Sequence, residues 1–149
     1  MSTPTYIYKI LLSLPDTLPE KLPVSELDKV SGCLHFSTGC QIPETLTYFF
    51  DDIPKVYVLR VKYEDVAKDT KWENQTGGRY FDINISLLNC LPSCIAQGTA
   101  GQENFYPHVY NNLRLGRAEI ESWLVFEQDG SKGWETAIEK ARSESWLAY

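Results

Sequence analysis

Long hydrophobic runs are missing from this sequence of 149 residues. No apolar stretch approaches the roughly 20 residues that a membrane-spanning helix needs, so we expect no membrane segment. The N-terminal segment has no basic start, and Lys9 interrupts its apolar run, which is unlike a signal peptide. The sequence therefore predicts a cytoplasmic protein.

Basic residues are also in the minority. Lys and Arg together number 14, against 20 Asp and Glu, which gives a net charge of -6, and the basic residues form no cluster. Because binding to a phosphate backbone needs a concentrated basic surface, the composition argues against nucleic acid as a partner. A small-molecule ligand is the expected partner, and a protein partner is left open.

The cysteines do not form an evident disulfide or metal framework. A chain of this length buries about two thirds of its unfolded surface in one core without staples, so Cys33, Cys40, Cys90 and Cys94 are interpreted as thiols. Cys90 and Cys94 would hold a metal only with two further ligands, and the two histidines belong to separate motifs. The sequence predicts no metal.

Alternation of apolar and polar residues predicts strands over residues 5–12, 56–62 and 119–127, and an extended segment over 105–110. The strand at 119–127 is expected to bury Ile120, Trp123, Leu124, Val125 and Phe126. Helices are expected over residues 43–51, 63–71 and 133–149, the last of which packs on the sheet or contacts a partner. These elements predict a single α+β domain over residues 1–149.

Lys9 and the stretch 22–38, LPVSELDKVSGCLHFST, are the most informative polar features. Lys9 lies among apolar neighbours and either reaches the surface, which we favour, or projects into a polar cleft. Ser25 is placed to cap a short helical turn that Gly32 ends. Alternation then puts Cys33 and His35 on one face with Ser37, where His35 is either a structural residue or a ligand contact.

A second polar and aromatic cluster follows later in the chain. Trp72 and Glu73 precede a loop, and alternation places Tyr106, His108 and Tyr110 on one face. The segment 74–103 contains the strand-like RYFDINI and the glycine-rich QGTAGQ, and is interpreted as a hairpin or lid, or as a plain surface insertion.

These motifs resemble the DUF952 family, whose members read approximately LPxSxxDxxxGFIHLSTxxQ. The resemblance spans most of residues 6–125, with an atypical insertion at about 74–103 and with Asn111 in place of a glycine. The residues that carry it are Tyr8, Lys9, Ile10, Pro23, Ser25, Asp28, Gly32, His35, Ser37, Thr38, Gln41, Thr45, Phe49, Phe50, Leu59, Val61, Trp72, Glu73, Phe105, Pro107, His108 and Tyr110.

The family in turn is similar to the ADP-ribosyltransferase superfamily, which implies a mixed, largely antiparallel split β core with short flanking helices and a cleft for NAD. On this resemblance His35, His108 and Glu73 are the candidate catalytic residues, with Glu119 and Glu121 as other candidates for the carboxylate. The candidate NAD contacts are Tyr8, Lys9, His35, Ser37, Thr38, Gln41, Trp72 and Tyr110. A binding module without transfer activity and a protein-interaction domain are the alternatives.

Overall fold

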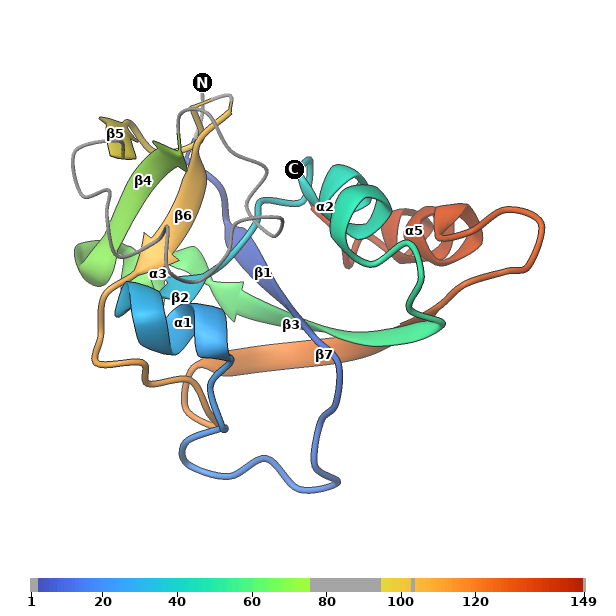
Figure 1. Ribbon diagram of the computed structural model, residues 1–149, viewed down its shortest axis with the longest axis horizontal. Helices are drawn as coiled ribbons and strands as arrows, with labels where there is room; N and C mark the ends of the chain where they lie inside the picture. Colours follow the sequence, from blue (N-terminus) through green and yellow to red (C-terminus); the bar gives the residue numbers. More distant parts are fainter. Residues whose placement is uncertain (1–2, 76–94, 103, 149) are drawn as a thin grey trace.

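The protein is described here by a computed structural model that covers residues 3–75, 95–102 and 104–148. Two small antiparallel sheets form the β core, and short helices flank them (Figure 1). The first sheet has the order β1-β3-β7, formed by β1 (Tyr6–Leu11), β3 (Lys55–Lys62) and β7 (Ile120–Glu127). The second has the order β2-β6-β4-β5, formed by β2 (Leu34–His35), β6 (Tyr106–Val109), β4 (Thr70–Gln75) and β5 (Ile95–Gly98). The predicted α+β class with a split, antiparallel β core is confirmed.

The helices are short. Their bounds are α1 (Glu26–Ser31), α2 (Ile42–Phe49), α3 (Tyr63–Val66), the 3-10 turn η1 (Ala67–Asp69) and α5 (Glu135–Ser143). Of those described, α1 has both a side-chain N-cap, Ser25, and a glycine C-cap, Gly32. In Figure 1, α2 and α5 lie together on the side away from the four-stranded sheet. None of the described helices is long and apolar enough to cross a membrane.

The two sheets meet at one point on β1. Tyr8 and Ser37 exchange a pair of backbone hydrogen bonds, each 2.8 Å between nitrogen and oxygen. Ser37 follows β2 in the chain, so this bridge fixes the end of β2 against the middle of β1. The polar segment around His35 is therefore held where the sheets diverge.

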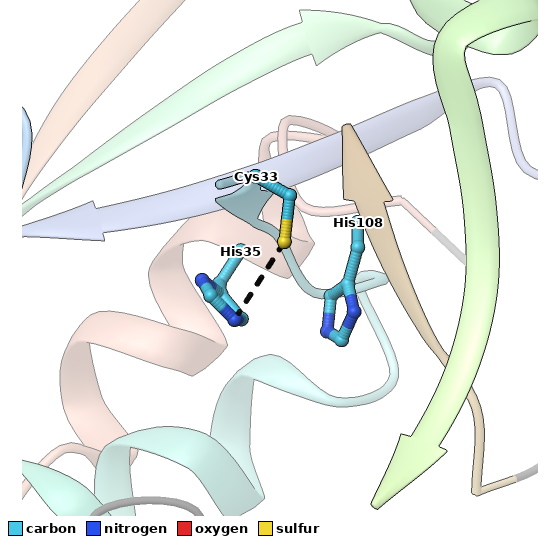
Figure 2. A group of neighbouring side chains, drawn as sticks. All are labelled: Cys33, His35 and His108. Atoms are coloured by element: carbon cyan, nitrogen blue, oxygen red, sulfur yellow. Dashed lines mark hydrogen bonds between the residues drawn. The ribbon is translucent and has the colours of Figure 1, made fainter. Parts of the chain in front are cut away.

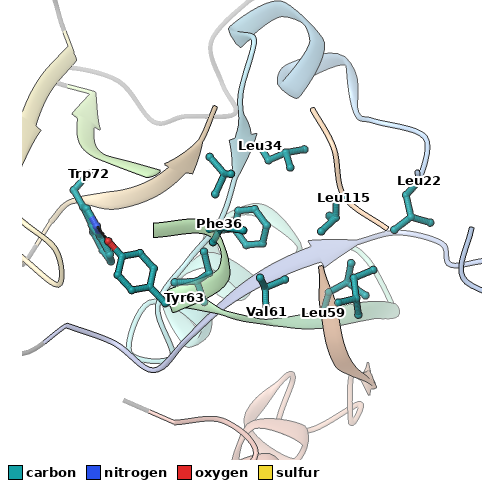
Figure 3. Close-up of a cluster of buried hydrophobic side chains, with 12 residues drawn as sticks. Leu22, Leu34, Phe36, Leu59, Val61, Tyr63, Trp72 and Leu115 are labelled. Atoms are coloured by element: carbon teal, nitrogen blue, oxygen red, sulfur yellow. Dashed lines mark hydrogen bonds between the residues drawn. The ribbon is translucent and has the colours of Figure 1, made fainter. Parts of the chain in front are cut away.

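Two apolar clusters stabilise this arrangement. The first fills the space between the sheets (Figure 3) and includes Ile7, Leu34, Leu59, Trp72 and Val109. The second lies between the three-stranded sheet and the helices α2 and α5, and includes Val58, Leu46, Phe126, Trp134, Ile138 and Ala141. The C-terminal helix thus packs against the core. This is the first of the two predicted alternatives, packing on the sheet or contact with a partner.

Three predicted elements need correction. On β7, Trp123 and Val125 are 38% and 42% exposed, because the strand alternates and buries Ile120 and Phe126 on its other face. The helix predicted to reach residue 71 ends earlier, and Trp72 lies within β4. The C-terminal helix ends at Ser143.

The predicted hairpin or lid at 74–103 lies mostly outside the described residues. Of that segment the structure describes residues 74–75 and 95–102. Within it, β5 pairs with β4, with Gly98 opposite Trp72.

After α5 the chain turns back and its last described residues cover Tyr8. The Tyr8 hydroxyl donates to the carbonyl of Trp146 at 3.0 Å and accepts from the amide of Ala148 at 2.8 Å. This returning segment also passes directly over Gly39, where a Cβ would overlap the carbonyl oxygen of Ala148. Gly39 is therefore required for this close approach of two backbone segments.

We expect Gly39→Ala to lower the free energy of unfolding by about 1–3 kcal/mol, the usual cost of forcing an extra carbon into a packed site. Gly130→Ala is the matched control, because a Cβ there meets nothing within 4 Å and the effect should stay within about 0.5 kcal/mol. Urea unfolding followed by circular dichroism measures both. Equal stability of the two variants would contradict the described path of residues 144–148.

Candidate functional site

The site begins with Asp28 on the first short helix. The side chain of Ser25 accepts a hydrogen bond from the Asp28 amide at 3.1 Å, so Ser25 is the N-cap, as predicted. Gly32 ends the helix in the left-handed conformation (φ 72°) and returns its amide to the Asp28 carbonyl at 2.9 Å. With both ends of the helix fixed, the Asp28 side chain is directed inward and is only 1% exposed.

The Asp28 carboxylate holds two other groups of the site. One oxygen forms an ion pair with Nζ of Lys9 at 2.8 Å. The other accepts from Nδ1 of His35 at 2.7 Å and from the His35 amide at 3.2 Å. Lys9 also donates to the His35 carbonyl at 3.1 Å, which closes the network.

This network corrects the prediction for Lys9. The residue is 7% exposed rather than at the surface, and its charge is matched by Asp28. A buried ammonium needs a partner of opposite charge, and Asp28, which was recognised only as a motif residue, supplies it.

Burial and pairing set the protonation states of this network. Burial alone would raise the Asp28 pKa, but the hydrogen bond from His35 and the charge of Lys9 outweigh it and lower the pKa to about 2. Burial lowers the His35 pKa to about 4, although Asp28 opposes the change. At neutral pH, His35 is therefore a neutral imidazole that donates through Nδ1, and its Nε2 carries a lone pair.

A second buried carboxylate and histidine lie on the four-stranded sheet. Glu73 on β4 accepts from Nδ1 of His108 at 3.0 Å and from the Tyr110 hydroxyl at 2.6 Å. Burial tends to raise the Glu73 pKa, but these two hydrogen bonds lower it overall. Burial and the hydrogen bond to Glu73 raise the pKa of Tyr110, so its hydroxyl stays protonated.

The pairing of β2 with β6 brings the two histidines together. His35 lies directly opposite His108 in the antiparallel register, and opposed residues share one face of a sheet. Their ring centroids are 4.6 Å apart in an edge-to-face arrangement. Figure 2 shows Cys33 beside them, with its sulfur 4.0 Å from Nε2 of His35. Burial raises the pKa of the Cys33 thiol to about 12.

A cavity of about 1230 Å³ opens in front of the two histidines. Apolar side chains of the β1 end, of the following loop and of α2 form most of its wall, and polar side chains from several elements line it as well. The predicted site residues that line it are Tyr8, Lys9, His35, Ser37 and His108. Asp28, Thr45 and Tyr106 line it as well.

The other predicted site residues lie outside the described lining. Trp72 is in the core between the sheets and donates to the Tyr63 hydroxyl at 3.1 Å. Gln41 accepts from the amide of Thr38 at 2.9 Å and donates to the carbonyl of Phe105 at 2.7 Å. Glu73 accepts hydrogen bonds from His108 and from Tyr110.

The sequence contained a signal for two residues that were not predicted as site residues. Asp28 is part of the quoted motif and is the buried residue of α1. Cys33 was expected on the same face as His35. Neither clue revealed that His108 would join them, because no local pattern encodes the pairing of β2 with β6.

Comparison with known proteins now gives the family. The model of the family described as "Protein of unknown function (DUF952)" matches residues 19–122, which is more than half of the chain. The chain belongs to the DUF952 family. The motif residues from Pro23 to Tyr110 fall inside this match. None of the proteins with curated descriptions matches.

Solved structures show that this DUF952 chain shares its fold with protein CC0527 from Caulobacter crescentus. The crystal structure of CC0527 is 22% identical, with a TM-score of 0.55, over 91% of this chain and 99% of that one. Its solution NMR structure is also 22% identical, with a TM-score of 0.56, over 91% and 96% of the two chains. At this identity, the likeness concerns the fold alone.

We expect Asp28→Asn to destabilise the protein by about 3–5 kcal/mol, because it leaves the buried Lys9 ammonium without a counter-charge. Adding Lys9→Met to this variant should recover part of the loss. Urea unfolding of the single and double variants measures the coupling, and Asp16→Asn, at an exposed position, is the control. Equal losses for Asp28→Asn and Asp16→Asn would show that the pair carries no stability.

The lowered His35 pKa predicts a dependence of stability on pH. An unfolded histidine titrates near 6.5, whereas folded His35 stays neutral down to about pH 4. Between these values the unfolded state binds more protons, so the stabilising contribution is complete above about pH 6.5 and is lost as the pH falls toward 4. Urea unfolding in EDTA across this range should show the decline. His35→Gln should flatten it, and an unchanged slope would contradict the prediction.

Proposed function

We propose that the cavity binds NAD or a related nucleotide, and that the nicotinamide nucleoside end of the ligand occupies it. One observation carries this proposal: a large cavity combines a mostly apolar wall with a smaller number of polar side chains, His35 and Ser37 among them. Ligand sites typically combine apolar area with a few orienting polar groups, and their volumes run from about 300 to 1,000 Å³. The volume here is ample for a nucleotide.

The apolar wall suits a flat ring. Tyr48 and Phe49 of α2 and Tyr106 of β6 line the cavity. Aromatic faces stack well on bases, and they attract a positively charged ring such as oxidised nicotinamide. The net charge of -6 also favours a cationic ring over an isolated anion.

The polar side chains suit ribose hydroxyls and an amide. The Ser37 and Thr45 hydroxyls are 3.4 Å apart and both line the cavity. His35 adds a ring that Asp28 keeps in a fixed tautomer and orientation. These groups offer both donors and acceptors to a ligand in the cavity.

Charge argues for recognition through the nucleoside rather than through the pyrophosphate. Lys9 is the cation of the described lining, and Asp28 already neutralises it. Negative phosphates would gain little from this pair. We therefore infer that the phosphates of a bound dinucleotide extend toward solvent.

Binding without transfer fits the geometry better than ADP-ribosyl transfer does. Transfer needs a carboxylate that faces the ribose as positive charge develops there. Glu73, the carboxylate that the resemblance suggested, is absent from the described lining, and His108 and Tyr110 hold it. The carboxylates that do line the cavity are Asp28, which is paired with Lys9, and Glu44 of α2, to which the resemblance assigns no role. Transferase activity is kept as the second outcome of the test below.

Thermal unfolding with nicotinamide riboside, NAD and ADP-ribose tests the proposal. A ligand at 100 times its Kd should add about 2.7 kcal/mol to the native state and raise the Tm by several degrees. We expect nicotinamide riboside and NAD to stabilise the protein and ADP-ribose to do so less. No shift with any of the three would contradict nucleotide binding.

Tyr48→Ala is the sharpest variant, because Tyr48 lines the cavity yet is 61% exposed and contributes little to the core. Loss of one stacking partner should weaken binding by about 1–3 kcal/mol, with stability unchanged. Trp123→Ala, on the outer face of β7, is the matched aromatic control and should bind normally. Release of nicotinamide from NAD on incubation would favour the transferase alternative.

A further inference from the structure

We propose that Cys33, His35 and His108 form a site for a transition metal, with Zn²⁺ as the metal. Cys33 and His35 are neighbours in the sequence, and the pairing of β2 with β6 brings the distant His108 to them (Figure 2). Each offers one donor atom, and these atoms all lie within 4.8 Å of one another. The inference goes beyond nucleotide binding and does not depend on it.

The donor set is the first argument. Imidazole nitrogen and thiolate sulfur are the ligands that zinc prefers, and a site with three protein ligands keeps one coordination position open. The donors of a tetrahedral zinc site lie roughly 3.3–3.6 Å apart, given zinc–nitrogen and zinc–sulfur bonds of about 2.0–2.3 Å. Sγ of Cys33 and Nε2 of His35 are 4.0 Å apart, and all three donors lie within 4.8 Å of one another, so the side chains must move closer together to bind the metal.

The carboxylates behind the histidines are the second, independent argument. Asp28 accepts from Nδ1 of His35, and Glu73 accepts from Nδ1 of His108. Metal-binding histidines almost always donate their other ring nitrogen to such a partner, which fixes the tautomer and makes the ligand more basic. Both histidines carry this arrangement, with Nε2 as the nitrogen for the metal.

The charges around the site also suit a divalent cation. Before binding, Asp28 and Glu73 contribute two negative charges and Lys9 contributes one positive charge. A divalent metal together with a Cys33 thiolate adds two positive charges and one negative charge, which brings these groups to neutrality. Binding would release the thiol proton.

The open position would face the cavity. His35 and His108 both line it, whereas Cys33 is buried behind them. A water molecule or an oxygen or nitrogen atom of a cavity ligand could therefore complete the coordination. This proposal departs from the expectation of no metal, which treated the two histidines as members of separate motifs.

Cobalt titration of the full chain tests the site, after EDTA treatment and buffer exchange. Co²⁺ bound through a thiolate gives a near-ultraviolet charge-transfer band, and tetrahedral coordination gives intense visible bands. We expect both in the wild-type protein, with loss of both on adding Zn²⁺. Cys33→Ser should lose the charge-transfer band. Glu73→Gln should weaken metal binding about 10- to 100-fold, as removal of a carboxylate behind a ligand usually does.

The other cysteines provide the controls. Cys40 is exposed and is not one of the three proposed ligands, so Cys40→Ser should keep the bands. The triple variant Cys40→Ser/Cys90→Ser/Cys94→Ser leaves Cys33 as the single thiol and keeps all three proposed ligands. The proposal is overturned if wild-type protein shows no thiolate band, if the band survives Cys33→Ser, or if the triple variant lacks it.

Discussion

The buried carboxylate of Asp28 is the constraint on which the site depends. It contacts Lys9 of β1 and both the ring and the backbone of His35 in β2, so one side chain ties α1 to a strand of each sheet. A charge at 1% exposure is tolerable only when it is paired and hydrogen-bonded. The geometry of the three residues is therefore strongly coupled, and none can move alone without leaving a buried polar group unsatisfied.

A second buried carboxylate on the four-stranded sheet binds a histidine in the same way. Glu73 holds His108 as Asp28 holds His35, and the antiparallel register of β2 and β6 sets the two rings face to edge. Two imidazoles with fixed tautomers that line a cavity form a preorganised polar surface. This arrangement connects the two proposals. The apolar wall supplies binding area for a ligand. The two histidines either contact the ligand directly or bind a metal that the ligand could reach.

The cavity lies beside the Tyr8–Ser37 bridge, where the two sheets meet. The loop after β1 and α2 form much of its wall. The C-terminal segment packs against the other side of Tyr8 through Trp146 and Ala148. The last helix also packs on the core, through Ile138 and Ala141.

Local features of this protein were determined by the sequence alone. The alternating pattern of β1, the N-cap at Ser25 and the helix end at Gly32 each depend on residues a few positions apart, so they could be predicted, as could the family. On β7 the same alternation was misjudged, because apolar character was taken for burial at Trp123.

Only the tertiary structure decided the burial of Lys9 and the meeting of His35 with His108. Both depend on pairing between strands that are distant in the chain, and the register of such pairing is set by the packing of the whole core rather than by any local pattern. The sequence thus supplied the polar residues of the site, and the long-range pairing decided which of them face one another.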